Sequence, residues 1–211
     1  MLLAIDTSSG SSVAVVDRDA GVLAERSVAD TMRHAEVIGT LIADALAEAD
    51  VAPADLSAVA AGMGPGPFTG LRVGIAAARS FALGAGIPVV PLISHDAIAF
   101  RRLAENPTGR LLVVTDARRR EVYWSGYGGV DDAGLPVRIG GPGLRKPDAL
   151  GDDTAALGAM ERLDAAAVSA GALGMLAELT YLHGRSFADD RALYLRSPDV
   201  TPSAGPKRVT A

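Results

Sequence analysis

The sequence predicts an α/β protein of two lobes, each built on a mixed sheet flanked by helices, with the second lobe reduced. Along the first hundred residues, short β-type runs alternate with helical patterns in the order β-β-β-α-β-α-β-α. The second half of the chain then opens with another series of β-type runs, which indicates a duplicated unit. The 211 residues, 49% of them hydrophobic, are enough for one large domain or two small ones.

The first lobe is predicted to span residues 1–105. Its first three β-type runs are separated by turn residues and predict an antiparallel meander. Later helices alternate with single strands, which requires crossover connections and adds parallel strands to the sheet. This order is typical of the ribonuclease-H-like fold. The predicted strands are 2–6, 12–17, 22–28, 56–62 and 87–92, and the predicted helices are 33–49, 69–84 and 95–104.

The second lobe, residues 106–200, repeats this opening in a degenerate form. Strands are predicted at 111–117, 121–129 and 134–140, a Gly/Pro-rich stretch at 140–151 interrupts the pattern, and one convincing helix follows at 172–182. Residues 201–211 are predicted to be a flexible tail. Two such lobes face to face are typical of the superfamily of actin, sugar kinases and heat-shock ATPases, in which a nucleotide binds between the lobes.

Composition excludes several classes of protein. The net charge of −5 argues against a stand-alone nucleic-acid binder, because such proteins need a basic face. The absence of cysteine excludes disulfides, thiolate metal sites and cysteine nucleophiles. No apolar run is long enough to span a membrane, and Asp6 and Asp17 interrupt the apolar N-terminus, so we expect a cytoplasmic protein with no membrane partner.

A loop of small polar residues, Asp6, Thr7, Ser8 and Ser9, follows the first predicted strand. In the superfamily this position carries the first phosphate loop, whose backbone N–H and hydroxyl groups face an anion. A plain hairpin turn is the other interpretation, because serine, glycine and aspartate favour turns. From the sequence, the loop is either a relic of a phosphate site or a plain turn.

A Gly/Pro loop at residues 64–67 leads into a helix that carries unusual glycines. Thr69 is predicted to be the N-cap of this helix. Gly70, Gly74, Ala78 and Ala82 then form a ridge with almost no side chains, although glycine inside a helix costs about 1 kcal/mol relative to alanine. Close packing explains this ridge, either on the first helix of the same chain or on a helix of another protein. An anion at the helix N-terminus, beside Arg72, is the alternative.

Other catalytic machinery is not evident. The histidines, His34, His95 and His183, are scattered, and none has a second histidine four residues away as a helical metal site requires. No serine lies in a nucleophile-elbow motif. The basic run at 118–120 is followed directly by Glu121 and is interpreted as a solvated strand end.

The segment GPGPFTGLRVG resembles the G-P-G-S-F-T-G-L-R-[IV]-G signature of the TsaB (YeaZ) family. The resemblance extends to LLAIDTS, HAEVI, IPVVPLIS, DARRREVYW and LYLRSPDV, which occur in order across residues 2–200. Pro67 departs from the family pattern, because it stands where the family usually has serine. Any contact made by that serine hydroxyl is therefore absent.

The resemblance implies a two-lobed, actin-like protein with no catalysis and no cofactor of its own. Such proteins pair with the homologous catalytic subunit TsaD, and the pair works with the ATPase TsaE on threonylcarbamoyl-AMP and tRNA to make threonylcarbamoyladenosine beside the anticodon. Alone they form homodimers, and whether ATP or ADP binds at the interface of the complex is left open. TsaD-like subunits carry H-x-x-x-H as metal ligands, whereas Ile38 follows His34 here.

The resemblance also implies a four-helix interface made by the first two helices of each partner. The predicted interface residues are Phe68, Thr69, Gly70, Arg72, Gly74, Ala78, Ala82 and His34. Gly74→Leu is accordingly predicted to leave the monomer folded and to weaken the complex.

Two other functions stay open from the sequence. One is an active ATP-dependent phosphotransferase or ATPase in which Asp6 organises Mg²⁺. The segment that opens the second lobe, residues 115–118, lacks the glycines that a second phosphate loop requires. The other is a homodimeric interaction module without a role in tRNA modification.

Overall fold

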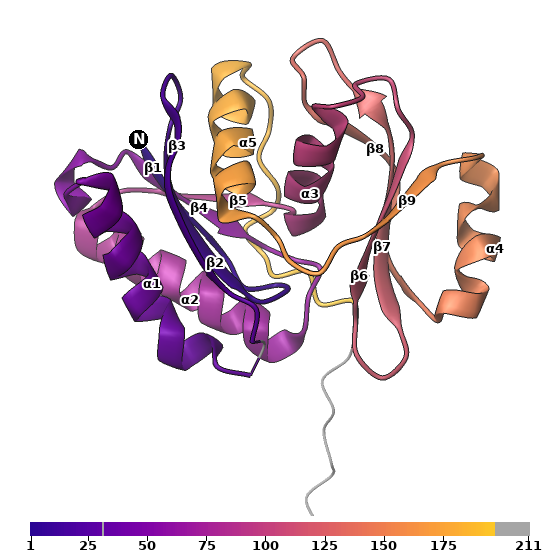
Figure 1. Ribbon diagram of the computed structural model, residues 1–211, viewed down its shortest axis with the longest axis horizontal. Helices are drawn as coiled ribbons and strands as arrows, with labels where there is room; N and C mark the ends of the chain where they lie inside the picture. The colour runs from indigo at the N-terminus through magenta and orange to yellow at the C-terminus, as the bar shows by residue number, and fades with distance from the viewer. Residues whose placement is uncertain (31, 197–211) are drawn as a thin grey trace, which may run out of the picture.

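The computed structural model describes residues 1–30 and 32–196, and the predicted tail at 201–211 lies outside the described residues. Two mixed sheets stand side by side, with α3 and α5 between them (Figure 1). The strands of the first sheet lie in the order β3-β2-β1-β4-β5, and those of the second in the order β8-β7-β6-β9. The strands are β1 Leu2–Asp6, β2 Ser11–Asp17, β3 Gly21–Val28, β4 Ala58–Gly62, β5 Val89–Leu92, β6 Leu111–Asp116, β7 Val122–Val130, β8 Pro136–Arg145 and β9 Glu161–Asp164.

Helices complete the layers on both sides of the sheets. The outer face of the first sheet is covered by α1 and α2, and α4 lies outside the second sheet (Figure 1). The α-helices are α1 His34–Ala49, α2 Phe68–Ala85, α3 Ser94–Leu103, α4 Leu150–Thr154 and α5 Ala170–Leu182. No helix among the described residues is long and apolar enough to cross a membrane.

The two sheets share one plan, which confirms the predicted fold class and duplication. β1 pairs antiparallel with β2 and parallel with β4. β6 pairs in the same way, antiparallel with β7 and parallel with β9. The second sheet has no counterpart of β5, so it is the reduced copy.

The strands at the centre of the first sheet are buried on both faces. Leu3 and Ile5 of β1 face the core beneath α1 and α2, whereas Leu2 and Ala4 face α5. This alternation follows from the period of two in a strand, which sends successive side chains to opposite faces. It explains why β1 reads as a continuous apolar run.

The helix α5 packs differently from the prediction, which assigned it to the second lobe. Gly174 of α5 lies so close to Val16 and Ala4 that a Cβ there would come within 2.7 Å of a Val16 methyl carbon. One hydrophobic cluster includes residues of the first sheet, the second sheet, α3 and α5. The two lobes therefore share a core.

The Gly/Pro-rich stretch does not interrupt the second sheet as predicted, because β8 continues through it to Arg145. The glycines there make room for the indole of Trp124 and for Leu157. A Cβ at Gly140 would lie 2.7 Å from a Leu157 methyl carbon, and a Cβ at Gly143 would overlap the Trp124 indole. Glycine is thus a packing requirement of this strand rather than a break in it.

The chain after α5 continues along the first lobe, on which α5 itself packs. We call residues 187–196 the C-terminal strap. The amide of Ala188 donates to the Pro91 carbonyl at 3.1 Å, and the amide of Leu193 donates to the Met63 carbonyl at 2.8 Å. Arg196, at the end of the strap, pairs with Glu121 of the second lobe. The strap therefore links both lobes.

Candidate functional site

The predicted phosphate loop folds back on its own aspartate. Asp6 is fully buried at the end of β1. Its Oδ1 accepts hydrogen bonds from the Ser8 amide at 2.8 Å and the Ser8 hydroxyl at 2.5 Å, and its Oδ2 accepts from the Ser94 hydroxyl at 2.5 Å. Burial raises the pKa of Asp6, an effect that the hydrogen bonds from Ser8 and Ser94 partly offset.

Ser94 was missed in the sequence, although it joins the two loops of the site. Besides donating to Asp6, its hydroxyl accepts a hydrogen bond from the Gly64 amide at 3.0 Å. Gly62 stands against the same carboxylate, and a Cβ at this position would overlap the Asp6 side chain. The carboxylate is thus enclosed by β4, the Gly/Pro loop and the start of α3. In the sequence, Ser94 directly precedes the predicted helix at 95–104, a position where serine is a common N-cap, so nothing marked it as a partner of Asp6.

The other hydroxyls of the loop also bind protein groups. Thr7 donates to the Gly70 carbonyl at 2.7 Å, and Ser9 donates to the Ala166 carbonyl at 2.8 Å. The Gly/Pro loop packs directly on this segment, since a Cβ at Gly66 would lie 2.8 Å from the Ser8 Cα. In this arrangement the loop after β1 connects that strand to α2 through Thr7 and to the Ala166 carbonyl through Ser9.

The glycine ridge of α2 faces inward, so its prediction as a partner surface is wrong. Gly70, Gly74, Ala78 and Ala82 are all buried within the chain. A Cβ at Gly74 would overlap the Thr7 hydroxyl, and one at Gly70 would lie 2.5 Å from the Thr7 carbonyl oxygen. The missing side chains therefore let α2 lie directly on the loop after β1 and, at Gly70, beside His34 at the start of α1.

The predicted N-cap of α2 is also wrong. The helix begins at Phe68 with Pro67 as its N-cap, and no side chain accepts a capping hydrogen bond. Thr69 is exposed in the first turn. Proline fixes an extended approach to the helix through its restricted φ of −61°, so no capping hydroxyl is needed to set the direction of the chain.

His34 was predicted to face the partner, but the structure buries it. Its Nδ1 forms a 2.8 Å hydrogen bond with the Ser11 hydroxyl, and its ring lies beside Gly70 of α2. Ile38, four residues later, is buried in the core beneath α1 and α2. This position therefore holds together β2, α1 and α2.

The solvent side of α1 carries two exposed stripes, one of small residues (Ala35, Gly39, Ala43 and Ala47) and one of larger, mostly acidic residues (Glu36, Thr40, Asp44 and Glu48). On α1 the exposed positions recur every four residues. On α2 the exposed residues include the predicted Thr69 and Arg72, and the guanidinium of Arg72 lies 3.7 Å from the centre of the half-buried Phe68 ring. We call this surface the outer α1/α2 face; it comprises Ala35, Gly39, Ala43 and Ala47 of α1 with Thr69, Arg72, Ala76, Ser80 and Leu83 of α2.

A polar network joins the two lobes beside α3. His95 is fully buried, with its Nδ1 2.8 Å from the Ser125 hydroxyl and its Nε2 2.9 Å from the Thr115 hydroxyl. Burial lowers the pKa of His95 to about 3, and the nearby Arg138 adds to this effect. The imidazole is therefore neutral at physiological pH and serves as a hydrogen-bonding link between α3 and the second sheet.

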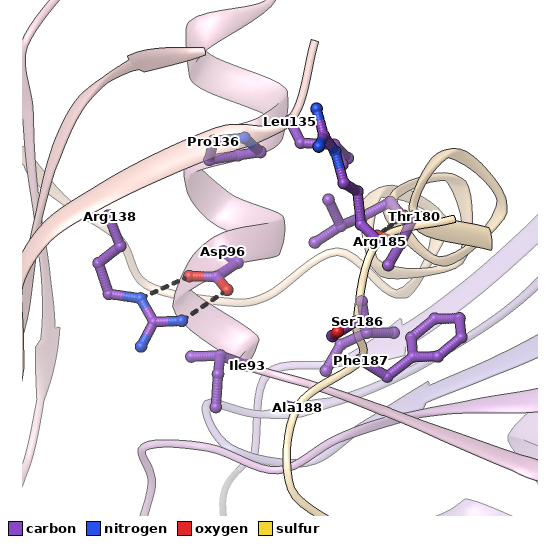
Figure 2. A pocket seen from close by; sticks show the side chains of 12 residues that line it. Ile93, Asp96, Leu135, Pro136, Arg138, Thr180, Arg185, Ser186, Phe187 and Ala188 are labelled. Atoms are coloured by element: carbon purple, nitrogen blue, oxygen red, sulfur yellow. Dashed lines mark hydrogen bonds and ion pairs between the residues drawn. The ribbon is translucent and has the colours of Figure 1, made fainter. Parts of the chain in front are cut away.

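The neighbouring Asp96 lies at a cavity of about 250 Å³ (Figure 2). It accepts hydrogen bonds from the Tyr127 hydroxyl at 2.7 Å and from the Arg138 guanidinium at 2.9 and 3.1 Å. Arg185 on the other side of the cavity pairs with Asp131 and Asp132. Both arginines that line this cavity, Arg138 and Arg185, are thus neutralised by carboxylates of the same chain.

The turn that opens the second lobe is strained rather than glycine-rich. Arg118, Arg119 and Arg120 have φ values of 65°, 52° and 62°. The Asp116 carboxylate stabilises the turn by accepting a hydrogen bond from the Arg118 amide at 2.8 Å. Within residues 1–30 and 32–196, no cluster of three or more His, Cys, Asp or Glu side chains could hold a metal ion.

The comparisons with known proteins agree with this architecture. Residues 15–164 match the family model of TsaD, tRNA N6-adenosine threonylcarbamoyltransferase. An uncharacterized protein of Mycobacterium tuberculosis is 40% identical over 213 residues, which cover 96% of this chain and 95% of that protein.

Two further matches carry the TsaB and YeaZ names. The tRNA threonylcarbamoyladenosine biosynthesis protein TsaB of Escherichia coli is 34% identical over 126 residues, 60% of this chain and 54% of that protein. The structure of YeaZ from Pseudomonas aeruginosa superposes with a TM-score of 0.74 at 27% identity and covers 92% of this chain and 99% of that one. The chain therefore belongs to the TsaD family, and within it to the TsaB (YeaZ) proteins that its sequence resembles.

Proposed function

We propose that this protein is a non-catalytic subunit of the complex that transfers a threonylcarbamoyl group to the tRNA adenosine beside the anticodon. The observation that carries the proposal is the enclosed carboxylate of Asp6. Both of its oxygens accept hydrogen bonds from serines of the same chain. A carboxylate held this way is not presented to a metal-bound phosphate, and the adjacent hydroxyls of Thr7 and Ser9 donate to backbone carbonyls.

The proposed partner is a homologous catalytic subunit of the TsaD type, docked on the outer α1/α2 face. The small side chains that α1 contributes to this face would let a helix of another protein approach α1 closely, as in tight helix packing. A second copy of the chain would use the same face when the partner is absent. We further propose that the pair acts with the ATPase TsaE, that tRNA reaches this subunit through the complex, and that any ATP or ADP binds at the interface of the complex.

The test is threonylcarbamoyladenosine formation on unmodified tRNA, in a mixture of TsaD, TsaE, threonylcarbamoyl-AMP and ATP from the same organism. Product should require the addition of this protein. Asp6→Asn should support product formation at close to the wild-type rate, because its amide oxygen can still accept from Ser8. Asp6→Ala is the poorer choice, since it would leave the buried groups of Ser8 and Ser94 without their acceptor.

Two outcomes would contradict the proposal. Equal product in the absence of the protein would remove its role as a required subunit. Loss of product with an Asp6→Asn protein that melts at the wild-type temperature would indicate a catalytic carboxylate, and would favour the phosphotransferase or ATPase function instead.

A further inference from the structure

The outer face of the second sheet is covered by much less chain than the outer face of the first. Helices α1 and α2, of 16 and 18 residues, cover the first sheet. The second sheet has α4 in this place, a helix of five residues with a short 3-10 turn before and after it (Figure 1). We call residues 146–160, which connect β8 to β9, the cap.

Three apolar side chains attach the cap to the sheet. Leu150 is buried, and the half-buried Leu157 and Met160 join it in a small hydrophobic cluster. Most of the other residues of the cap are exposed. The sheet contributes to this cluster Leu112 and Val114 of β6 with Val122 and Trp124 of β7.

Polar contacts add little to this attachment. In the part of the chain that the structure describes, the hydrogen bonds of the cap stay within it, as from the Thr154 hydroxyl to the Leu150 carbonyl at 3.0 Å. Asp153 pairs with Arg145 at the end of β8 at 2.7 Å, but the arginine is 52% exposed, and exposed ion pairs stabilise only weakly. A segment with few buried contacts and no hydrogen bond to its support opens more readily than a core strand.

Trp124 lies beneath the cap with its indole N–H unpaired. The residue is 7% exposed, and its Nε1 has no hydrogen-bond acceptor within residues 1–30 and 32–196. A buried donor without an acceptor destabilises the state that buries it, and solvent would supply the acceptor once the cap had moved away. The apolar contacts that close the cap are therefore opposed by this group.

We propose that the cap opens as a unit and uncovers Trp124 and the apolar residues around it, while both sheets stay folded. The sheet does not depend on the cap, because β6 pairs with β7 and β9, and its other face packs in the core that the two lobes share. The open protein presents an apolar sheet face on the second lobe. No residue of the cap or of this face belongs to the outer α1/α2 face, and the inference does not rest on the proposed function.

The experiment uses single cysteines, since the natural chain has none. Val114→Cys places a thiol beneath the cap, and Val113→Cys places one at the next residue of the same strand, in the shared core. Both valines are fully buried. The measurement is the rate of reaction with dithiobis(nitrobenzoate) at urea concentrations below the unfolding transition. We expect the Val114→Cys thiol to react at least about 100-fold faster than the Val113→Cys thiol. Its rate should depend little on urea, because opening of the cap exposes little surface.

Leu3→Ala, added to each cysteine variant, separates opening of the cap from global unfolding. Leu3 lies in the core of the first sheet, away from the cap. Its truncation should raise the rate for Val113→Cys about 30-fold or more and leave the rate for Val114→Cys nearly unchanged.

Two results would overturn the proposal. One is equal reaction rates for the two thiols with the same dependence on urea. The other is an equal increase at both positions when Leu3→Ala is added. If Val114→Cys melts well below the wild type, Leu112→Cys and Leu111→Cys form the replacement pair, because Leu112 also lies beneath the cap and Leu111 in the shared core.

Discussion

Substitution of Gly74 by alanine, which adds one methyl group, tests whether α2 packs directly on the Thr7 loop. Alanine would gain about 1 kcal/mol in helix propensity, but its Cβ would collide with Thr7. We expect Gly74→Ala to lower the free energy of unfolding by about 1–3 kcal/mol, and Gly74→Leu to prevent folding rather than to give a folded monomer. Urea denaturation is the measurement.

Gly84→Ala is the matched control in the same helix, because nothing lies within 4 Å of a Cβ at that position. It should be neutral or stabilising by less than about 1 kcal/mol. A Gly74→Ala protein as stable as this control would mean that α2 does not rest on the Thr7 loop.

His95 makes the stability of the protein sensitive to mild acid. Its pKa of about 3 in the folded protein lies below the usual 6.5, so the unfolded chain takes up the proton first as the pH falls. The stabilisation is complete above about pH 6.5 and is lost progressively down to about pH 3, at about 1.4 kcal/mol per pH unit. Lowering the pH from 7.5 to 5.0 should therefore lower the free energy of unfolding by about 2 kcal/mol through His95 alone.

The check is urea denaturation of the wild type and of His95→Gln at both pH values. Asp6 acts in the opposite direction, because its raised pKa means that the folded state takes up a proton more readily in acid. Only the difference between the two proteins isolates His95. A wild type and a variant with the same pH dependence would rule out a buried neutral imidazole.

The helix α1 presents Gly39 on its solvent side, in the middle of the outer α1/α2 face. Nothing lies within 4 Å of a Cβ there, so Gly39→Arg should fold and should melt close to the wild-type temperature. A close helix contact would not accept the long charged side chain. We expect at least a tenfold loss of affinity for the TsaD-type partner by calorimetry, corresponding to about 1.4 kcal/mol.

Gly151→Arg provides the control, since Gly151 is similarly open but lies on α4, outside the second sheet. Its affinity for the partner should be unchanged. If Gly39→Arg binds as tightly as Gly151→Arg, the partner does not dock on this face.

The whole molecule is expected to unfold as one unit, because one hydrophobic cluster includes both sheets. The single tryptophan, Trp124, reports on the second sheet. Leu3 is fully buried in β1 of the first sheet. Leu3→Ala should lower stability by about 2–5 kcal/mol and should shift the Trp124 fluorescence transition and the circular dichroism transition together. A tryptophan transition that stays in place would mean that the lobes unfold independently.

The sequence by itself determined the strands and helices of the first lobe and the three strands that open the second, whereas β9 and α4 were not predicted. Short apolar runs with a period of two, and amphipathic patterns with a period near 3.6, are local properties that burial enforces along each element. The first three strands and α1 therefore lie within about a residue of their predicted bounds. The motif that begins in the Gly/Pro loop also identified the family before any contact was known.

Only the tertiary structure decided what the small residues face. A row of small residues spaced four apart on a helix indicates that another segment packs closely against it. The spacing is the same whether that segment belongs to another protein or is the Thr7 loop of the same chain. Likewise, the spacing of Asp6 from Ser94 along the chain carries no sign that their side chains lie 2.5 Å apart. Such contacts join residues far apart in sequence, and their chemistry depends on which surfaces the packed core encloses.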